Sequence, residues 1–292
     1  MNPDTTSAWE PHTEVSTEIV APGPVAALAA LLDDGLATPA AGDALPPLWH
    51  WVALPQWANS GVLGADGHPR RGTFLPPVEL PRRMFAGGSV VFHDTLTVGE
   101  TVVRESEVLT VSEKNGRSGQ LVIVDVRTRL HNSAGDVAIE EIQNLVYRPA
   151  APSPANPERE QPSEFANPAQ PLSQVSSHEW TLRTDPSLLM RFSAATANAH
   201  RIHYDWPYTT QVEGYPGLVV HGPLQALALA EVHRLSGGAP VKALTHRGNA
   251  PLFCGELARL TSTLRPDGNL LELFGPRSEP AKPSAVLDLI TT

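Results

Sequence analysis

The sequence has a single cysteine, Cys254, which excludes an intrachain disulfide and any metal site built from several thiolates. A catalytic thiol stays open on this count alone. The surrounding text "PLFCGEL" is apolar and typical of a strand edge, where a cysteine packs as a small hydrophobic residue. We therefore expect Cys254 to be structural.

Basic residues and long apolar runs are also scarce. The 21 Lys and Arg are outnumbered by 31 Asp and Glu, so the formal charge is −10 and the pI is near 5.5. Nucleic-acid binding needs clustered cations, and no basic stripe follows the chain. No stretch approaches the roughly eighteen apolar residues of a membrane helix, and "MNPDTTSAWEPHTEV" lacks the features of a signal peptide. These absences predict a cytoplasmic protein without nucleic-acid or membrane partners.

Proline, in contrast, is concentrated in one segment. Residues 149–171, "PAAPSPANPEREQPSEFANPAQP", are nearly devoid of large apolar side chains and predict neither a helix nor a central strand. We interpret this segment as a linker between an N-terminal domain of residues 1–148 and a C-terminal domain of residues 172–292. Because 41% of the chain is hydrophobic, each domain can build its own core.

The first domain reads mainly as strands. Residues 89–148 alternate apolar and polar side chains, and "EKNGRSG" and "NSAGD" supply turn residues, so an antiparallel meander is predicted. Upstream, "PGPVAALAALLDD" predicts a short helix with Pro24 near its first turn. The text "PPLWHWVALPQWANSGVLGADGHP" predicts an irregular aromatic segment.

The second domain repeats helix and strands. "PLQALALAEVHRLSG" predicts a helix that begins near Pro223 and ends before Gly237, and strand-like text follows in residues 242–265, 270–277 and 284–291. "RFSAATANAHRIHYD" predicts a strand end, then a helical turn and a loop. Helix followed by antiparallel strands, occurring twice, indicates the α+β class with a helix packed on a curved sheet.

Chemistry-bearing residues gather in "NAHRIHYDWPYTTQVEGYPGLVVHGPLQ", residues 198–225. His200 and His203 are three residues apart, so in a helical turn their side chains can share one face. With Asp205 and His221 they offer metal ligands, although His-x-x-His has low specificity for metal. The other interpretation is that they are surface or hydrogen-bonded loop residues. Spacing alone leaves both open.

A family resemblance separates these interpretations. "FSAATANAHRIHYD" followed by "YPGLVVHGPLQALAL" resembles the active-site signature of the MaoC-like, or R-specific enoyl-CoA hydratase, family. The wording Asn-x-His-Arg-Ile-His is similar to the branch that contains itaconyl-CoA and mesaconyl-CoA hydratases and mitochondrial 3-hydroxyacyl-thioester dehydratases. The match covers residues 190–230. It implies a double hot-dog fold, in which each half wraps an antiparallel sheet around a long helix, with a degenerate N-terminal and a catalytic C-terminal hot-dog domain.

The resemblance also implies catalytic roles. His203 matches the family's catalytic histidine, and Asn198 stands where the typical member has a catalytic aspartate. An amide cannot exchange a proton near neutral pH, so we expect Asn198 to hold a water molecule that His203 deprotonates. Gly222 matches the glycine whose N–H binds the thioester oxygen, beside the positive end of the following helix. His200 is the alternative base.

Four residues are expected to bind substrate or orient the site: Arg201, His200, His221 and Val220. Arg201 is a candidate for a coenzyme A phosphate or a substrate carboxylate, and a salt bridge is its other expected fate. Asp205 is expected to bond locally to the loop backbone. No metal or other cofactor is expected.

These residues predict a hydro-lyase that adds water to, or removes it from, a short, branched or dicarboxylic enoyl-CoA such as mesaconyl-CoA or itaconyl-CoA. The alternatives are a 3-hydroxyacyl-carrier-protein dehydratase, which needs a basic rim for its acidic carrier, a catalytically silent acyl-thioester-binding subunit, and a thioesterase. The expected partner is the acyl-CoA thioester. A monomer and a homodimer both stay open, because a double hot dog pairs its two halves internally.

Overall fold

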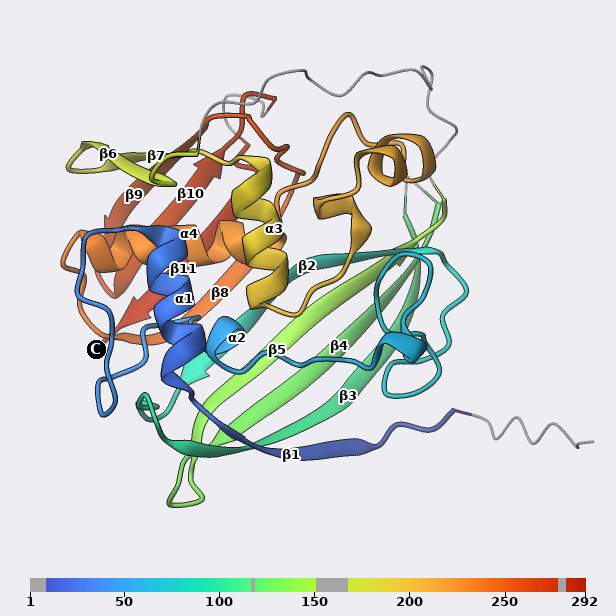
Figure 1. Ribbon diagram of the computed structural model, residues 1–292, viewed down its shortest axis with the longest axis horizontal. Coiled ribbons are helices and arrows are strands. Elements are labelled where there is room, and N and C mark those ends of the chain that lie inside the picture. The colour runs from blue at the N-terminus through green and yellow to red at the C-terminus, as the bar shows by residue number, and fades with distance from the viewer. Residues whose placement is uncertain (1–8, 117–118, 151–167, 278–281) are drawn as a thin grey trace, which may run out of the picture.

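The computed structural model describes residues 9–116, 119–150, 168–277 and 282–292, and these build one eleven-stranded antiparallel sheet (Figure 1). The strand order is β1-β3-β4-β5-β2-β8-β11-β10-β9-β7-β6, so the N-terminal half forms one side of the sheet and the C-terminal half the other. The two halves join where β2 pairs with β8. The N-terminal strands are β1 (Thr13–Ile19), β2 (Arg82–Phe92), β3 (Thr101–Gly116), β4 (Gly119–His131) and β5 (Val137–Arg148). The C-terminal strands are β6 (Leu172–Ser176), β7 (Glu179–Leu182), β8 (Val241–Gly248), β9 (Ala258–Arg265), β10 (Gly268–Phe274) and β11 (Ala285–Thr291).

The C-terminal half has the predicted central helix. Helix α4 (Gly222–Leu235) has Pro223 in its first turn and lies across β8 to β11, with nearly every residue from Leu224 to His233 buried. Its small residues, such as Ala226 and Ala230, let the curved sheet approach closely. The sequence prediction of this helix and of its strands is confirmed, and the arrangement is that of a hot dog.

The N-terminal half has the predicted meander, but among the described residues it has no helix as long as α4. Helix α2 (His50–Ala53) is only four residues long, and Pro55 follows its C-cap residue Leu54. Residues 54–81 then run as an irregular segment in which the structure has only one 3-10 turn, η1 (Ser60–Val62). The prediction of an irregular segment here is confirmed. The predicted double hot-dog fold is confirmed as well, and among the described residues its N-terminal half has the short helix α2 where the C-terminal half has the long helix α4.

Two helices connect the halves. Helix α1 (Pro22–Leu32), predicted from the sequence, packs against α2 and against α3 (Pro186–Ala195). The sequence predicted that residues 191–205 begin with a strand end, and this was wrong, because they begin inside α3. Asp185 caps this helix by accepting from the N–H groups of Ser187 and Leu188. This capping stabilises the first turn of a helix that buries Leu188, Leu189 and Phe192 on one side.

Buried polar contacts also link α4 to the N-terminal half. The Trp49 indole N–H donates to Glu231 of α4, and Arg234 pairs with both Glu231 and Asp34. Burial is the largest effect on Glu231 and raises the pKa of its carboxyl. The long helix is therefore fixed to the short one by a hydrogen-bonded cluster.

Three remaining expectations concern other parts of the chain. Most of the expected linker, residues 151–167, lies outside the described residues. Cys254 lies in a turn between β8 and β9 instead of in a strand edge, and burial raises the pKa of its thiol to about 12, which disfavours a reactive thiolate. No helix among the described residues is both long and apolar enough to cross a membrane.

Candidate active site

The motif residues follow α3 in one continuous turn. Ala197 adopts a left-handed φ of 52°, which reverses the chain so that the Asn198 N–H donates to the Ser193 carbonyl at 2.9 Å. A 3-10 turn, η2 (Arg201–His203), comes next. The Val219 N–H then donates to the Ile202 carbonyl at 2.9 Å, which brings the chain before α4 beside His203. Local backbone bonds thus place the two halves of the sequence motif together.

His203 is buried and has a defined tautomer. Its Nδ1 lies 2.7 Å from the Val219 carbonyl oxygen, so Nδ1 carries the proton and donates, and Nε2 keeps its lone pair. Burial lowers the pKa of His203 to about 4, and the hydrogen bond to Val219 only partly opposes this shift. The imidazole is therefore neutral at pH 7 and offers Nε2 as a base.

His221 supports the His203 ring from behind. The two rings are stacked with centroids 3.6 Å apart and planes 16° from parallel. His221 Nε2 lies 2.8 Å from the Ser193 hydroxyl of α3, and the side chain is fully buried. Burial lowers its pKa well below the usual value, so two neutral rings pack without charge repulsion. This geometry fits an orienting role for His221.

His200 lies on the other side of His203, with ring centroids 5.6 Å apart and planes nearly perpendicular. Its backbone N–H donates to the Asn198 side-chain oxygen at 3.0 Å, which fixes the amide and leaves the Asn198 NH₂ group pointing away as a donor. Burial lowers the pKa of His200 to about 2. His200 is thus a weaker base than His203.

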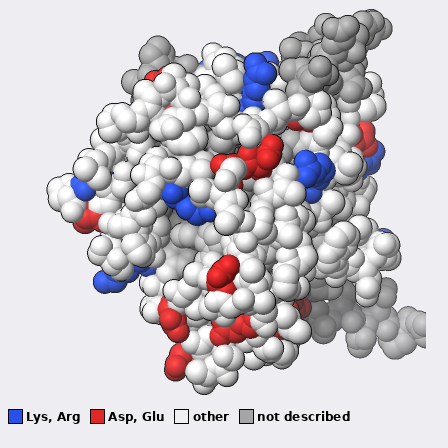
Figure 2. Space-filling view, turned by 60° about the vertical axis from the view of Figure 1, so that its left-hand side comes forward, with Lys and Arg blue, Asp and Glu red and all other residues white. Residues whose placement is uncertain are grey.

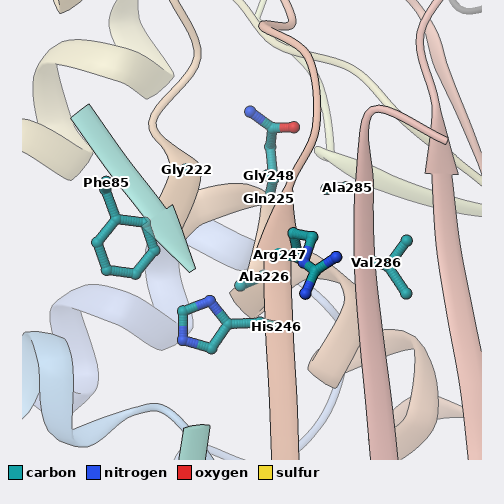
Figure 3. Close-up of a pocket in the computed structure, with 9 residues that line it drawn as sticks. All are labelled: Phe85, Gly222, Gln225, Ala226, His246, Arg247, Gly248, Ala285 and Val286. Carbon is teal, nitrogen blue, oxygen red and sulfur yellow. The ribbon is translucent and has the colours of Figure 1, made fainter. Parts of the chain in front are cut away.

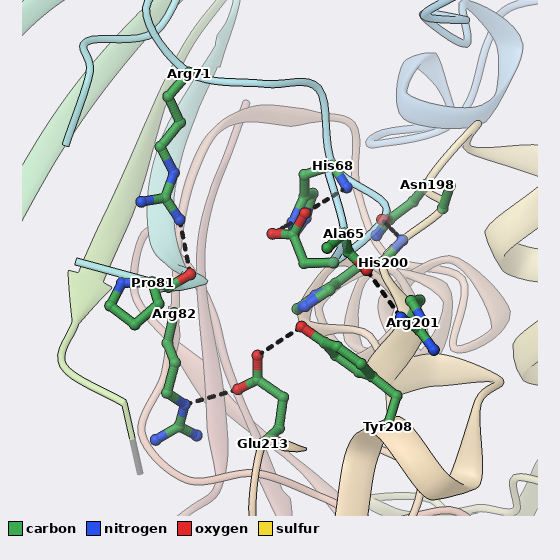
Figure 4. Close-up of polar contacts among 12 residues, drawn as sticks. Ala65, His68, Arg71, Pro81, Arg82, Asn198, His200, Arg201, Tyr208 and Glu213 are labelled. Carbon is green, nitrogen blue, oxygen red and sulfur yellow. Dashed lines mark hydrogen bonds and ion pairs between the residues drawn. The ribbon is translucent and has the colours of Figure 1, made fainter. Parts of the chain in front are cut away.

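The N-terminal half contributes two residues that sequence reasoning missed. Asp66 and His68 lie in the irregular segment after α2, with Asp66 Oδ2 at 3.0 Å from His68 Nδ1, and the His68 ring packs on His200 at 4.1 Å (Figure 4). Burial opposes the charged form of Asp66, but the hydrogen bond and charge of His68 outweigh it and hold the carboxyl pKa well below its usual range. Burial lowers the pKa of His68 to about 4. The only sequence signal was an Asp-Gly-His turn in text read as loop.

The segment that carries Asp66 is tightly docked on the motif. The Arg201 N–H donates to the Asp66 carbonyl at 2.9 Å, and the Arg201 guanidinium donates to the Ala65 carbonyl at 3.0 Å. Gly67 has a φ of +92°, and a Cβ at this position would lie 1.8 Å from the Ala199 carbonyl oxygen. Only glycine fits this approach, so the segment fixes the position of residues 198–201.

The metal set that spacing offered is not assembled, because Asp205 is used elsewhere. Its carboxylate accepts from the Arg201 guanidinium at 2.7 and 2.8 Å and from the Tyr208 N–H at 3.1 Å. The ligand atoms that do converge within 4.8 Å in the described part of the chain belong to Asp66, His68 and His200. Asp66 and His68 already use these ligand atoms in a hydrogen bond with each other.

Arg201 and Val220, both expected to bind substrate, have structural contacts. The Arg201 guanidinium pairs with Asp205 and lies 4.3 Å above the Tyr208 ring, so it is already engaged within the loop. Val220 is buried in the core, and its carbonyl accepts from the Gln225 side chain. These contacts favour the salt-bridge fate that was the alternative for Arg201.

Gly222 opens α4 at the boundary between the halves. A Cβ there would lie 2.9 Å from the Phe85 ring of β2, so glycine permits a close approach of the two backbones. The first N–H groups of a helix have no intrahelical acceptor, so Gly222 can donate to a ligand. A small pocket starts at Gly222 and is lined by Phe85 and His246, whose rings stack at 5.1 Å (Figure 3). The pocket also reaches Gln225, Ala226, Arg247, Gly248, Ala285 and Val286.

Known proteins resemble this chain in sequence and in fold. Residues 48–254 match the model of the hydroxyacyl-thioester dehydratase type 2 family. The chain is 42% identical to mesaconyl-C(4)-CoA hydratase of Chloroflexus aurantiacus over 91% of each protein. It is 26% identical to the mitochondrial hydroxyacyl-thioester dehydratase type 2 of Schizosaccharomyces pombe over 65% of this chain and 67% of that one.

The solved structure of HtdX from Mycobacterium tuberculosis has the same fold. It superposes with a TM-score of 0.65, covers 96% of this chain and 100% of its own, and is 19% identical. The family match spans both the motif and the segment that carries Asp66 and His68. The chain therefore belongs to the hydroxyacyl-thioester dehydratase type 2 family.

Proposed function

We propose that this hydro-lyase reversibly adds water to the double bond of a short dicarboxylic enoyl-CoA thioester, with His203 as the base. The observation that carries the assignment of the base is the hydrogen bond from His203 Nδ1 to the Val219 carbonyl, which leaves Nε2 free to accept a proton. The relative named for mesaconyl-C(4)-CoA supports the dicarboxylic substrate.

The reaction proceeds through an enolate. Nε2 of His203 takes a proton from water as the water oxygen bonds to the β-carbon, and the π electrons move toward the thioester carbonyl. The imidazolium then returns the proton to the α-carbon, so one water molecule is added in total. The negative charge of the enolate stabilises the imidazolium form of His203 and so raises the pKa of this side chain during the step.

Asn198 and Gly222 position the reacting groups. The Asn198 NH₂ group donates to the attacking water, because its side-chain oxygen is already engaged by the His200 N–H. The Gly222 N–H donates to the thioester oxygen, where the charge develops, and the start of α4 adds its partial positive charge. Asn198 thus serves without exchanging a proton, which accounts for an amide at this position.

The first test is a substrate screen of the wild type and a His203→Ala variant. Mesaconyl-C(4)-CoA, itaconyl-CoA and crotonyl-CoA are followed by loss of the conjugated-thioester absorbance and by mass. We expect the wild type to hydrate at least one of them and the variant to lose turnover by a factor on the order of a hundred or more. His178→Ala is the matched control, because His178 is exposed in the turn between β6 and β7.

Two outcomes would contradict the proposal. Turnover of His203→Ala equal to that of His178→Ala would remove His203 as the base and make His200 the residue to test. Binding of thioesters by the wild type without any change in mass would indicate a silent binding subunit instead, and release of free thiol would indicate a thioesterase.

A second candidate is dehydration of a 3-hydroxyacyl group on a carrier protein. The relative from Schizosaccharomyces pombe, named a hydroxyacyl-thioester dehydratase, favours it. An acidic carrier needs a basic rim, but on the face in Figure 2 the Lys and Arg side chains lie as separate groups. Turnover of a 3-hydroxyacyl carrier protein well above that of the matching CoA thioester would support this candidate.

A further inference from the structure

Arg83 of β2 lies on the inner face of the N-terminal half, close to the candidate active site. Residues two apart on a strand share a face, so Arg83 and Phe85 point to the same side of β2, and Phe85 contacts the position of Gly222. Across the sheet Arg83 is paired with Tyr147 of β5, which is fully buried on that face. The guanidinium also lies within electrostatic reach of His68 and His200.

Arg83 has no carboxylate partner. Among the residues that the structure describes, no Asp or Glu lies within ion-pair distance of it. Its neighbour Arg82 pairs with Glu213 at 2.8 Å, and the nearby Asp66 is occupied by His68. Burial is the largest effect on Arg83 and lowers its pKa, since a charged guanidinium away from water is costly.

The other arginine of this region is satisfied by the backbone. Arg71 donates to the carbonyls of Val78, Leu80 and Pro81 and lies 4.8 Å above the Tyr147 ring. The neighbouring histidines are neutral at pH 7, so Arg71 and Arg83 face the single negative charge of Asp66. The inner face therefore has one excess positive charge, which calls for an anion.

We propose that Arg83 binds the free carboxylate of a dicarboxylic acyl group whose thioester oxygen lies at the Gly222 N–H. This inference rests on the proposed function and adds the residue that selects the substrate. Two residues along a strand span roughly 7 Å, so Arg83 stands about one short acyl chain away from Phe85 and Gly222. A planar guanidinium matches a carboxylate with two parallel hydrogen bonds.

The anion is a carboxylate of the acyl group and not a phosphate of coenzyme A. The phosphates are separated from the thioester by the long pantetheine arm, whereas Arg83 lies beside His68 and His200, which pack on the catalytic segment. The occupant of Arg83 is therefore the far end of the acyl group, and monocarboxylic acyl groups leave this cation without a carboxylate partner.

The test compares two thioesters in Arg83→Gln and Arg83→Lys variants. We expect kcat/KM for mesaconyl-C(4)-CoA to fall about a hundredfold in Arg83→Gln, mostly through KM, and kcat/KM for crotonyl-CoA to fall by no more than about fivefold. Arg83→Lys keeps the charge and should recover part of the loss. Arg70→Gln is the matched control, because Arg70 is exposed in the irregular segment that precedes β2.

The outcomes separate this inference from the proposed function. Equal losses of kcat/KM for both thioesters in Arg83→Gln would overturn the binding of the acyl carboxylate by Arg83 and leave the hydratase assignment in place. They would indicate that Arg83 contacts coenzyme A or stabilises the fold. If the wild type hydrates neither thioester, the proposed function fails, and the binding of mesaconyl-C(4)-CoA, measured by calorimetry, then tests whether Arg83 binds the carboxylate. Weaker binding by Arg83→Gln than by Arg70→Gln would support this role of Arg83, and equal binding would overturn it.

Discussion

The two halves of this molecule share one sheet but use its inner face differently. The C-terminal half fills that face with the fourteen-residue helix α4, which carries Gly222 at its start. The N-terminal half keeps a four-residue helix, and an irregular segment with Asp66, His68 and Arg71 lies over its inner face instead. A half that gives up its central helix gains room for polar groups beside the catalytic residues of the other half.

The strands reflect the same difference. Those of the N-terminal half run for 11 to 16 residues in β2 to β5, whereas β8 to β11 of the C-terminal half run for 7 or 8. Longer cross-strand pairing replaces part of the packing that a helix supplies. The N-terminal half can therefore stay folded while its inner face carries Arg83 and the buried Tyr147.

The largest effect on activity is expected when the irregular segment that carries Gly67 is separated from residues 198–201 of the motif. Gly67→Ala places a Cβ 1.8 Å from the Ala199 carbonyl oxygen, so the two segments must separate. Misplacing catalytic groups by about 1 Å costs on the order of a hundredfold in rate, and we expect kcat to fall by about that factor. The measurement is steady-state hydration together with circular dichroism.

Gly135→Ala is the matched control for this variant. Gly135 has a similar φ of +91°, but a Cβ there has no heavy atom within 4 Å. It therefore reproduces the backbone strain without the clash. Similar activity in the two variants would mean that the docked segment does not hold the catalytic residues.

An intermediate effect is expected at the boundary of the halves, where His246 of β8 is buried against Phe85 of β2. Burial lowers the pKa of His246 to about 4, against a usual value near 6.5 in the unfolded chain. Between these values the unfolded chain binds a proton that the folded chain does not, so the stability present above pH 6.5 is lost as the pH falls toward 4. We expect His246→Phe to reduce the loss between pH 7 and pH 5 by about 2 kcal/mol.

Urea denaturation of the wild type and His246→Phe at both pH values measures this difference. An identical pH dependence in the two proteins would show that His246 does not titrate with folding. The pKa values of histidines 68, 200, 203 and 221 are lowered in the same way, so the variant should still lose stability in acid.

The smallest effect is expected at the start of α3 in the C-terminal half. Asp185→Ala removes the acceptor for two N–H groups of the first turn and should lower the free energy of unfolding by about 1 kcal/mol. Asp185→Asn keeps an acceptor and should lose only part of this. Because α3 carries Ser193, which bonds to His221, a loss of activity larger than the loss of stability would show that the cap also positions the site.

The C-terminal half was also easier to predict from the sequence than the N-terminal part of the site. Helix α4 and the meander were predictable because periodic apolar residues and turn residues are local signals. Helix α3 was missed because it is only ten residues long and because its start lies at the Asp185-Pro186 cap, upstream of the text that was interpreted as a strand end. The motif indicated His203, Asn198 and Gly222 together, since they lie within one short stretch.

The N-terminal part of the site gave no such signal. His68 and His200 are 132 positions apart in the chain, and only tertiary packing brings their rings together. Arg83 follows another arginine in a strand, where a charged residue ordinarily indicates a solvent-facing position. Its burial depends on the segment after α2, whose path no periodic pattern fixes.

The pairing of β2 with β8 has a consequence for how the catalytic centre assembles. Both contributors to the catalytic centre belong to one polypeptide, so their encounter is intramolecular and their effective concentration is fixed by the covalent connection. Gly222 and the segment that carries Asp66 and His68 therefore meet without the entropic cost of bringing two molecules together.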